Sequence, residues 1–184
     1  VFDPDKLAAG PTAAIDVGEH PAHVVVDRAG ALAFVTLSAD DSVAVIDLAR
    51  NAVTATIATG RYPHGLRISP DGRAIYVANV EDGSVSVLDA AKREEVARIP
   101  VGKAPVQVGF TPDGRQVYVS LRDEDSVAVI DTGSIIGKVT SQNARQPFAP
   151  STLAASFSSF GMACRPARIM IIMKGIHTQA SMTA

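Results

Sequence analysis

Short apolar runs separated by polar turn residues follow one another along the first 131 positions, and the whole pattern returns every 42 residues. The runs are rich in Val, Ile and Tyr, hold about five to seven residues and show no helical period. One repeat contains four of them, in the order GLRIS, AIYVANV, SVSVLD and EVARIPV. This pattern predicts four short β-strands per repeat and an all-β protein.

Residues of one type return at this spacing without a gap. The clearest sets contain glycine (Gly18, Gly60, Gly102), proline (Pro21, Pro63, Pro105) and aspartate (Asp47, Asp89, Asp131). A fixed period in this range is typical of an array in which each repeat is one supersecondary unit.

The residues between the runs favour tight turns. Ser69-Pro70-Asp71-Gly72 and Thr111-Pro112-Asp113-Gly114 place proline and glycine where a type I turn accepts them. The recurring aspartate ends the third run of each repeat. We expect its carboxylate to accept a backbone N–H group and to start the following turn, which is a structural role.

Four antiparallel strands per unit of about 40 residues indicate a β-propeller. Tyr76-Val77-Ala78-Asn79 is close to the Tyr-Val-Thr-Asn signature, and Phe34-Val35-Thr36-Leu37 and Tyr118-Val119-Ser120-Leu121 fill the same place in their repeats. On these residues, residues 13–131 resemble the YVTN family of β-propeller repeats. The resemblance implies a propeller fold and residence in the periplasm or outside the cell, with no defined activity.

The register of the repeat predicts the domain boundaries. Residues 1–17 are expected to be the end of a preceding blade, because a shift of 42 places Ile15 on Ile57. Three blades follow, at 18–59, 60–101 and 102–143, the last with an irregular fourth strand, and residues 144–184 form a non-repeat tail that is disordered or aberrant. Closed propellers have about 4–8 blades. The chain is therefore expected to form a partial, open propeller.

Composition excludes several classes of function. The formal charge is −2 and no stripe of Lys or Arg is present, which argues against a nucleic-acid partner. The single cysteine, Cys164, cannot form a disulfide within the chain. The apolar run at 169–173 is much shorter than the roughly 18 residues of a membrane span.

Candidate binding residues lie in one set of loops. In a four-stranded meander, the Gly-x-x-Pro connection between blades shares a face with the loop between the second and third strands. Histidines and other polar residues cluster in and just after these connections, and we expect them to bind a ligand: His20, His23, Arg61, His64, Lys103 and Gln107. His23 and His64 begin innermost strands, so they are predicted to border the mouth of the channel.

The same face carries acidic loops, at Asp40-Asp41, Glu81-Asp82 and Asp123-Glu124-Asp125. They are too short to match a calcium-binding loop and are interpreted as solvated turns. Histidines converging from neighbouring blades could bind copper or zinc, but their spacing differs between repeats and matches no compact metal motif. We therefore assign no metal ligand and no cofactor.

The sequence contains no catalytic motif of a recognised type. Gly-x-Ser-x-Gly, a phosphate-binding glycine loop and the Cys-x-x-Cys-His haem attachment sequence are all absent. No catalytic residue is assigned, and the sequence favours a non-catalytic module that offers a binding or scaffold surface to a protein or small ligand. The alternative is part of a metal- or haem-dependent oxidoreductase or of a lactonase-like hydrolase. Open blade faces also predict self-association.

Overall fold

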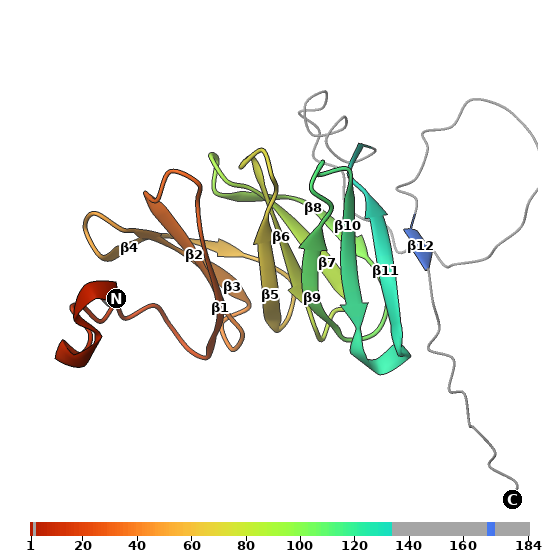
Figure 1. The fold of residues 1–184 in the computed structure, drawn as a ribbon. Coiled ribbons are helices and arrows are strands. Elements are labelled where there is room, and N and C mark those ends of the chain that lie inside the picture. Colours follow the sequence, from red (N-terminus) through yellow and green to blue (C-terminus); the bar gives the residue numbers. More distant parts are fainter. Residues whose placement is uncertain (2, 134–168, 172–184) are drawn as a thin grey trace, which may run out of the picture.

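The computed structural model describes residues 1, 3–133 and 169–171 of the chain. It contains three antiparallel sheets of four strands that follow one another from left to right in Figure 1. The first sheet holds β1 (Pro21–Val26), β2 (Leu32–Leu37), β3 (Ser42–Asp47) and β4 (Ala52–Ala58). The second holds β5 (Pro63–Ile68), β6 (Ala74–Asn79), β7 (Ser84–Asp89) and β8 (Glu94–Pro100). The third holds β9 (Pro105–Phe110), β10 (Gln116–Leu121), β11 (Ser126–Asp131) and β12 (Ile169–Ile171).

These sheets confirm the prediction of an all-β, partial propeller with four-stranded blades. In the first two blades, each strand pairs with the next in the chain, which is the meander expected from the four apolar runs. The first strands of the blades lie together, because β5 contacts both β1 and β9. We call β1, β5 and β9 the inner strands.

The core lies between the blades, where the facing sides of neighbouring sheets are apolar. The first interface contains Phe34, Val43, Val45, Leu66, Ile75 and Val77. The second contains Tyr76, Val85, Val87, Val117, Val119 and Ile130. Both faces of the middle blade are therefore buried, which explains why all residues of β6 except Asn79 are apolar and why the polar residues of its central strands are mostly small.

The turn predictions are confirmed. Gly72 donates its N–H to the Ser69 carbonyl at 2.8 Å, which closes the turn between β5 and β6. The carboxylate of Asp47 accepts the N–H groups of Ala49 and Arg50, each at 3.0 Å. Asp89 makes the same pair of contacts one repeat later. The aspartates therefore recur because each starts a turn.

The N-terminal segment differs from the expected outer strand. Pro4–Ala9 forms a 3-10 helix, η1, and the first strand begins only at Pro21. Ile15 and Val17 nevertheless pack against the free side of the first blade, beside Val35 and Ile46. A strand needs a paired neighbour for its backbone groups, and the described residues place no neighbouring strand beside this segment.

The third blade takes its fourth strand from the tail. Ile169–Ile171 pairs antiparallel with β11, from Ala128 to Ile130. It spans three residues, whereas β4 and β8 span seven. The predicted irregular strand before residue 143, and most of the tail, lie outside the described residues. Within the described part of the chain, no helix is long and apolar enough to cross a membrane.

Candidate functional site

Three of the polar side chains on the inner strands lie close together. His23 is the third residue of β1, His64 the second of β5 and Gln107 the third of β9. We call these three residues the inner-strand cluster. His23 and Gln107 occupy the same position of the repeat, at which the middle blade has Gly65.

The cluster is held by direct contacts between blades. The imidazole rings of His23 and His64 meet edge to face, with centroids 4.6 Å apart. Nε2 of His23 lies 2.9 Å from Nε2 of Gln107, at a separation of 84 residues along the chain. The amide N–H of Gln107 donates to this ring nitrogen when the imidazole is neutral and Nε2 carries no proton. Residues of three blades therefore form one polar group.

The surroundings of His23 favour its neutral form. Partial burial lowers the pKa of His23 below 6.5, and the neighbouring His64 and Arg67 lower it further because a second positive charge there is unfavourable. The backbone of His64 acts in the opposite direction, with the smallest effect. At neutral pH the ring can therefore accept a proton.

The cluster also holds polar atoms that the described residues leave without a hydrogen bond. Nδ1 of His23 and Nδ1 of His64 are both buried and have no partner in that part of the chain. Burying such an atom unpaired costs free energy, so each is suited to a water molecule or to a polar group of a ligand.

Thr36 fixes the two histidine strands relative to each other. Its side chain is fully buried, accepts the N–H of His23 at 3.0 Å and donates to the carbonyl of His64 at 2.8 Å. Ser120 is the equivalent residue of the third blade and accepts the N–H of Gln107 at 3.1 Å. The sequence interpretation did not identify these hydroxyl residues, although their spacing of 84, two repeats, was a signal that could have found them.

Gly65 brings the strand of Gln107 close. A Cβ atom at this position would collide with the Val106 carbonyl and would lie 3.0 Å from Cα of Gln107. Only glycine allows β5 and β9 to approach in this way. The missing side chain of the middle blade therefore makes room for the cluster.

The other predicted binding residues lie in the loops and do not join the cluster. Arg61 binds Asp82, with Nε 2.7 Å from Oδ1. Lys103 donates its backbone N–H to Glu124 at 2.8 Å. His20 is exposed and has a left-handed backbone with φ of 49°. Their part in ligand binding stays a prediction.

The acidic loops have a structural role that the sequence interpretation missed. A carboxylate in each repeat accepts the backbone N–H of the residue that follows the repeat glycine, in the pairs Asp40–Glu19, Asp82–Arg61 and Glu124–Lys103. We call these contacts the carboxylate clamps. They confirm that the two sets of loops share a face.

The clamps also explain the recurring glycine. A Cβ at Gly60 would lie 2.6 Å from the Asp82 carboxylate, and one at Gly18 would lie 2.5 Å from that of Asp40. Among the described residues, no three His, Cys, Asp or Glu side chains are grouped so that they could hold a metal ion.

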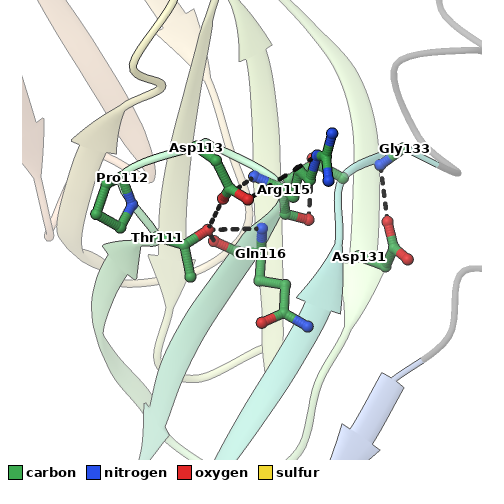
Figure 2. A pocket seen from close by; sticks show the side chains of 8 residues that line it. Thr111, Pro112, Asp113, Arg115, Gln116, Asp131 and Gly133 are labelled. Atoms are coloured by element: carbon green, nitrogen blue, oxygen red, sulfur yellow. Dashed lines mark hydrogen bonds and ion pairs between the residues drawn. The ribbon is translucent and has the colours of Figure 1, made fainter.

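A separate pocket of about 660 Å³ lies beyond the end of β9, at the Pro-Asp-Gly turn of the third blade (Figure 2). Its polar groups stabilise the turn: the Thr111 hydroxyl donates to Asp113 at 2.6 Å and thereby lowers the pKa of that carboxyl group. The Arg115 N–H also donates to Asp113, at 3.1 Å. Because these groups bind one another, the pocket is a weaker candidate than the inner-strand cluster.

Solved structures share this arrangement of blades. The chain resembles a chain of hydrazine synthase from Kuenenia stuttgartiensis, with 32% identity and a TM-score of 0.61 over 67% of this chain and 36% of that one. A candidate 6-phosphogluconolactonase from Bacteroides fragilis is 20% identical, with a TM-score of 0.56 over 60% of this chain and 34% of that one. Another from Bacteroides uniformis is also 20% identical, with a TM-score of 0.57 over 61% and 37%. The chain thus spans about a third of the length of each.

No curated protein matches the chain. The narrower resemblance to YVTN repeats stays a prediction. The model of the lactonase family, described as a seven-bladed β-propeller, matches residues 2–153. Because this match covers most of the chain and the fold has the four-stranded blades of a propeller, the chain belongs to the lactonase family of seven-bladed β-propellers.

Proposed function

We propose that this chain contributes the inner-strand cluster to a site that hydrolyses a lactone, the alternative function considered from the sequence. The observation that carries the proposal is the contact of His23 with His64 and Gln107. The lowered pKa of His23 favours the neutral form of its imidazole in this contact. Membership of the lactonase family supports the same chemistry.

The reaction requires a base near the lactone carbonyl. A water molecule displaces the Gln107 amide from Nε2 of neutral His23 and adds to the carbonyl carbon while Nε2 takes its proton, and the C–O bond of the ring then breaks. The proton passes from the imidazolium to the departing ring oxygen, so that the product is a hydroxy acid and the histidine is neutral again. Water is the only co-reactant.

The other cluster residues position this base. Gln107 contacts Nε2 of His23 and so fixes the ring orientation and the tautomer. The His64 ring, whose Nδ1 has no hydrogen-bond partner among the described residues, provides a second polar group on the adjacent strand. Thr36 keeps β1 and β5 at the separation that this contact needs.

Hydrolysis can be measured as acid released from glucono-δ-lactone and from its 6-phosphate, after subtraction of spontaneous hydrolysis. We expect His23→Gln to lower kcat about 100-fold or more, the range of general-base catalysis. His20→Gln is the matched control, because His20 lies exposed in a loop outside the cluster. Equal rates for the wild type and for His23→Gln would contradict the proposal.

The preferred expectation from the sequence, a non-catalytic binding or scaffold surface, predicts a different result. Calorimetry would then detect binding of the lactone or of its hydroxy acid while no acid is released above the spontaneous rate. In that case His23→Gln should weaken binding and His20→Gln should not. Residence in the periplasm or outside the cell stays a prediction that fractionation of the source cells would check.

A further inference from the structure

Arg67 places a positive charge on the inner strands, close to the inner-strand cluster. It is the fifth residue of β5, three positions after His64. Across β1, β5 and β9 it is the one residue with a permanent charge, because these strands otherwise hold apolar residues, proline, glycine, histidine and glutamine. The charge acts on His23 and lowers the pKa of its ring. The cluster therefore lies near a fixed cation.

This cation forms no ion pair and no side-chain hydrogen bond within the part of the chain that the structure describes. Most other arginines there do pair with a carboxylate: Arg50, Arg61, Arg73, Arg98, Arg115 and Arg122. A guanidinium group presents its N–H groups in a planar fork that matches the two oxygens of a carboxylate. Arg67 is therefore available to bind a carboxylate from outside the chain.

The exposure of Arg67 does not depend on the ends of the array. β5 belongs to the middle blade and contacts β1 as well as β9. Leu66 is buried between the first two blades, whereas Arg67, the next residue, is exposed. Adjacent residues of a strand point in opposite directions, so the Arg67 side chain points away from that interface.

The third blade leaves room at the level of Arg67. Gly109 occupies the same position of the repeat, 42 residues later, and a Cβ atom there would have no atom within 4 Å. His23 and Gln107 lie two positions earlier in the repeat, which corresponds to about 7 Å along a strand. A small organic acid can therefore reach both the cluster and Arg67.

We propose that Arg67 binds the carboxylate group of the hydroxy acid that lactone hydrolysis releases, while the hydroxyl groups of this product lie near His23 and Gln107. The bound product then keeps water and a new lactone molecule away from Nε2 of His23, so that the product inhibits the reaction. The lactone ring itself carries no such charge, and Arg67 therefore favours the product over the ring. The role as a product site rests on the proposed function, whereas carboxylate binding by Arg67 does not.

Calorimetry with gluconate tests the carboxylate site without any turnover. Glucitol is the matched ligand, because a neutral hydroxymethyl group replaces the carboxylate on the same carbon chain. At neutral pH and constant ionic strength, gluconate should bind about 10-fold or more tightly than glucitol, the effect of one charge-assisted contact.

Arg67→Gln should remove this difference between the two ligands. Arg67→Lys should keep part of it, because lysine retains the charge without the planar fork. Arg28→Gln is the control and should leave binding unchanged, since Arg28 lies exposed in the turn between β1 and β2, outside the cluster. Circular dichroism should show the same fold for all three variants.

Two further measurements locate the bound acid. The charged groups that act on His23 are His64 and Arg67. By NMR, gluconate should raise the pKa of His23, because a nearby negative charge favours the imidazolium, and this rise should be absent in Arg67→Gln. Gly109→Leu should weaken gluconate binding, because its side chain fills the space over β9 while the charge of Arg67 remains in place.

The outcomes separate this inference from the proposed function. Competitive inhibition of lactone hydrolysis by gluconate, lost in Arg67→Gln, would support the product site. Equal binding of gluconate and glucitol, or unchanged gluconate binding in Arg67→Gln, would overturn it. Hydrolysis that depends on His23 but is not inhibited by gluconate would overturn the product site alone. Gluconate binding through Arg67 without any hydrolysis would support the carboxylate site and contradict the proposed function.

Discussion

The side chain of Tyr76 places a polar hydroxyl group inside the apolar interface between the second and third blades. The ring is fully buried, and its hydroxyl group has no hydrogen-bond partner among the described residues. Burial raises the pKa of Tyr76 to about 12, with a smaller contribution from the charge of Asp71. Phe34, at the same position of the first blade, shows that the interface accepts a ring without the hydroxyl group.

Tyr76→Phe should therefore increase the free energy of unfolding by about 1 kcal/mol, because it removes an unpaired buried hydroxyl group. It should also change the response to alkali. The unfolded chain loses the phenol proton near pH 10, whereas the folded one keeps it to about pH 12, so the wild type loses stability between these values. Urea unfolding at neutral and alkaline pH measures both effects, and a less stable Phe variant would contradict them.

The titration of His23 is a second prediction at this scale. NMR should give His23 a pKa below 6.5, and Arg67→Gln should move it upward because one nearby positive charge is gone. Since protonation is harder in the folded state, His23 favours folding above pH 6.5, and this contribution falls as the pH drops through the lowered pKa. Lactone hydrolysis should decline over the same pH range. An unchanged His23 titration in Arg67→Gln would argue against this electrostatic explanation.

The sequence predicted some residue roles and missed others for a physical reason. Asp47 and Asp89 bind backbone groups two and three residues away, so a local pattern was enough to identify them as turn residues. The clamp carboxylate of Asp82 binds a group 21 residues earlier, and no short motif reveals such a partner. The contact of His23 with Gln107 crosses two blade boundaries and could not be predicted at all from one repeat.

At the scale of the strand, close approach of the inner strands decides whether the cluster forms. Gly65 and Gly109 are both glycines of inner strands, yet their surroundings differ. A Cβ at Gly65 would collide with β9, whereas a Cβ at Gly109 would have no atom within 4 Å. Substitution of Gly65 therefore tests the steric need for glycine, whereas substitution of Gly109 tests only the general effect of glycine on a strand.

Gly65→Ala should lower the free energy of unfolding by about 2 kcal/mol, because β5 and β9 must move apart. It should also lengthen the His23–Gln107 contact and reduce hydrolysis. Gly109→Ala should be neutral or slightly stabilising, since alanine limits the unfolded chain more than glycine does. Thermal unfolding of both variants, with crystal structures of the cluster, checks this; equal destabilisation would disprove the steric account.

The loop between β6 and β7 depends on its carboxylate clamp. Burial raises the pKa of Asp82, but the side chain and backbone of Arg61 lower it more, and the net pKa lies below 3.8. Asp82→Ala should therefore cost about 1 kcal/mol near neutral pH, and the difference from the wild type should shrink as the pH falls below 3.8. Glu81→Ala is the control, because Glu81 is exposed and makes only a 3.9 Å ion pair with Arg61. A Glu81→Ala variant as unstable as Asp82→Ala would contradict the clamp.

At the scale of the whole molecule, the position of a blade in the array determines its protection from solvent. Ile75, Val77, Ala78 and Val85 of the middle blade are fully buried, because sheets cover both of its faces. The sequence predicted the number of blades and their register, since both follow from the period. It could not predict that residues 169–171 supply β12, because the tail does not follow the repeat. Nor could it predict that residues 10–16 stay outside the sheets, because this depends on which strands lie beside them.

Hydrogen exchange of the backbone amides should follow the burial of the blades. The amides of β6 and β7 should exchange most slowly, and those of β1 and β9 faster, because opening an end blade exposes one interface whereas opening the middle blade exposes two. Uniform exchange across the three blades would show a single cooperative unit instead.

The carboxylate clamps and the inner-strand cluster join residues at very different distances along the chain. Each clamp closes a loop of 21 residues within one blade, so it can form early, while that blade folds as a local unit. The contact of His23 with Gln107 closes 84 residues and needs all three blades in place. We therefore expect the His23–Gln107 contact to form after the clamps, once the three described blades have packed together.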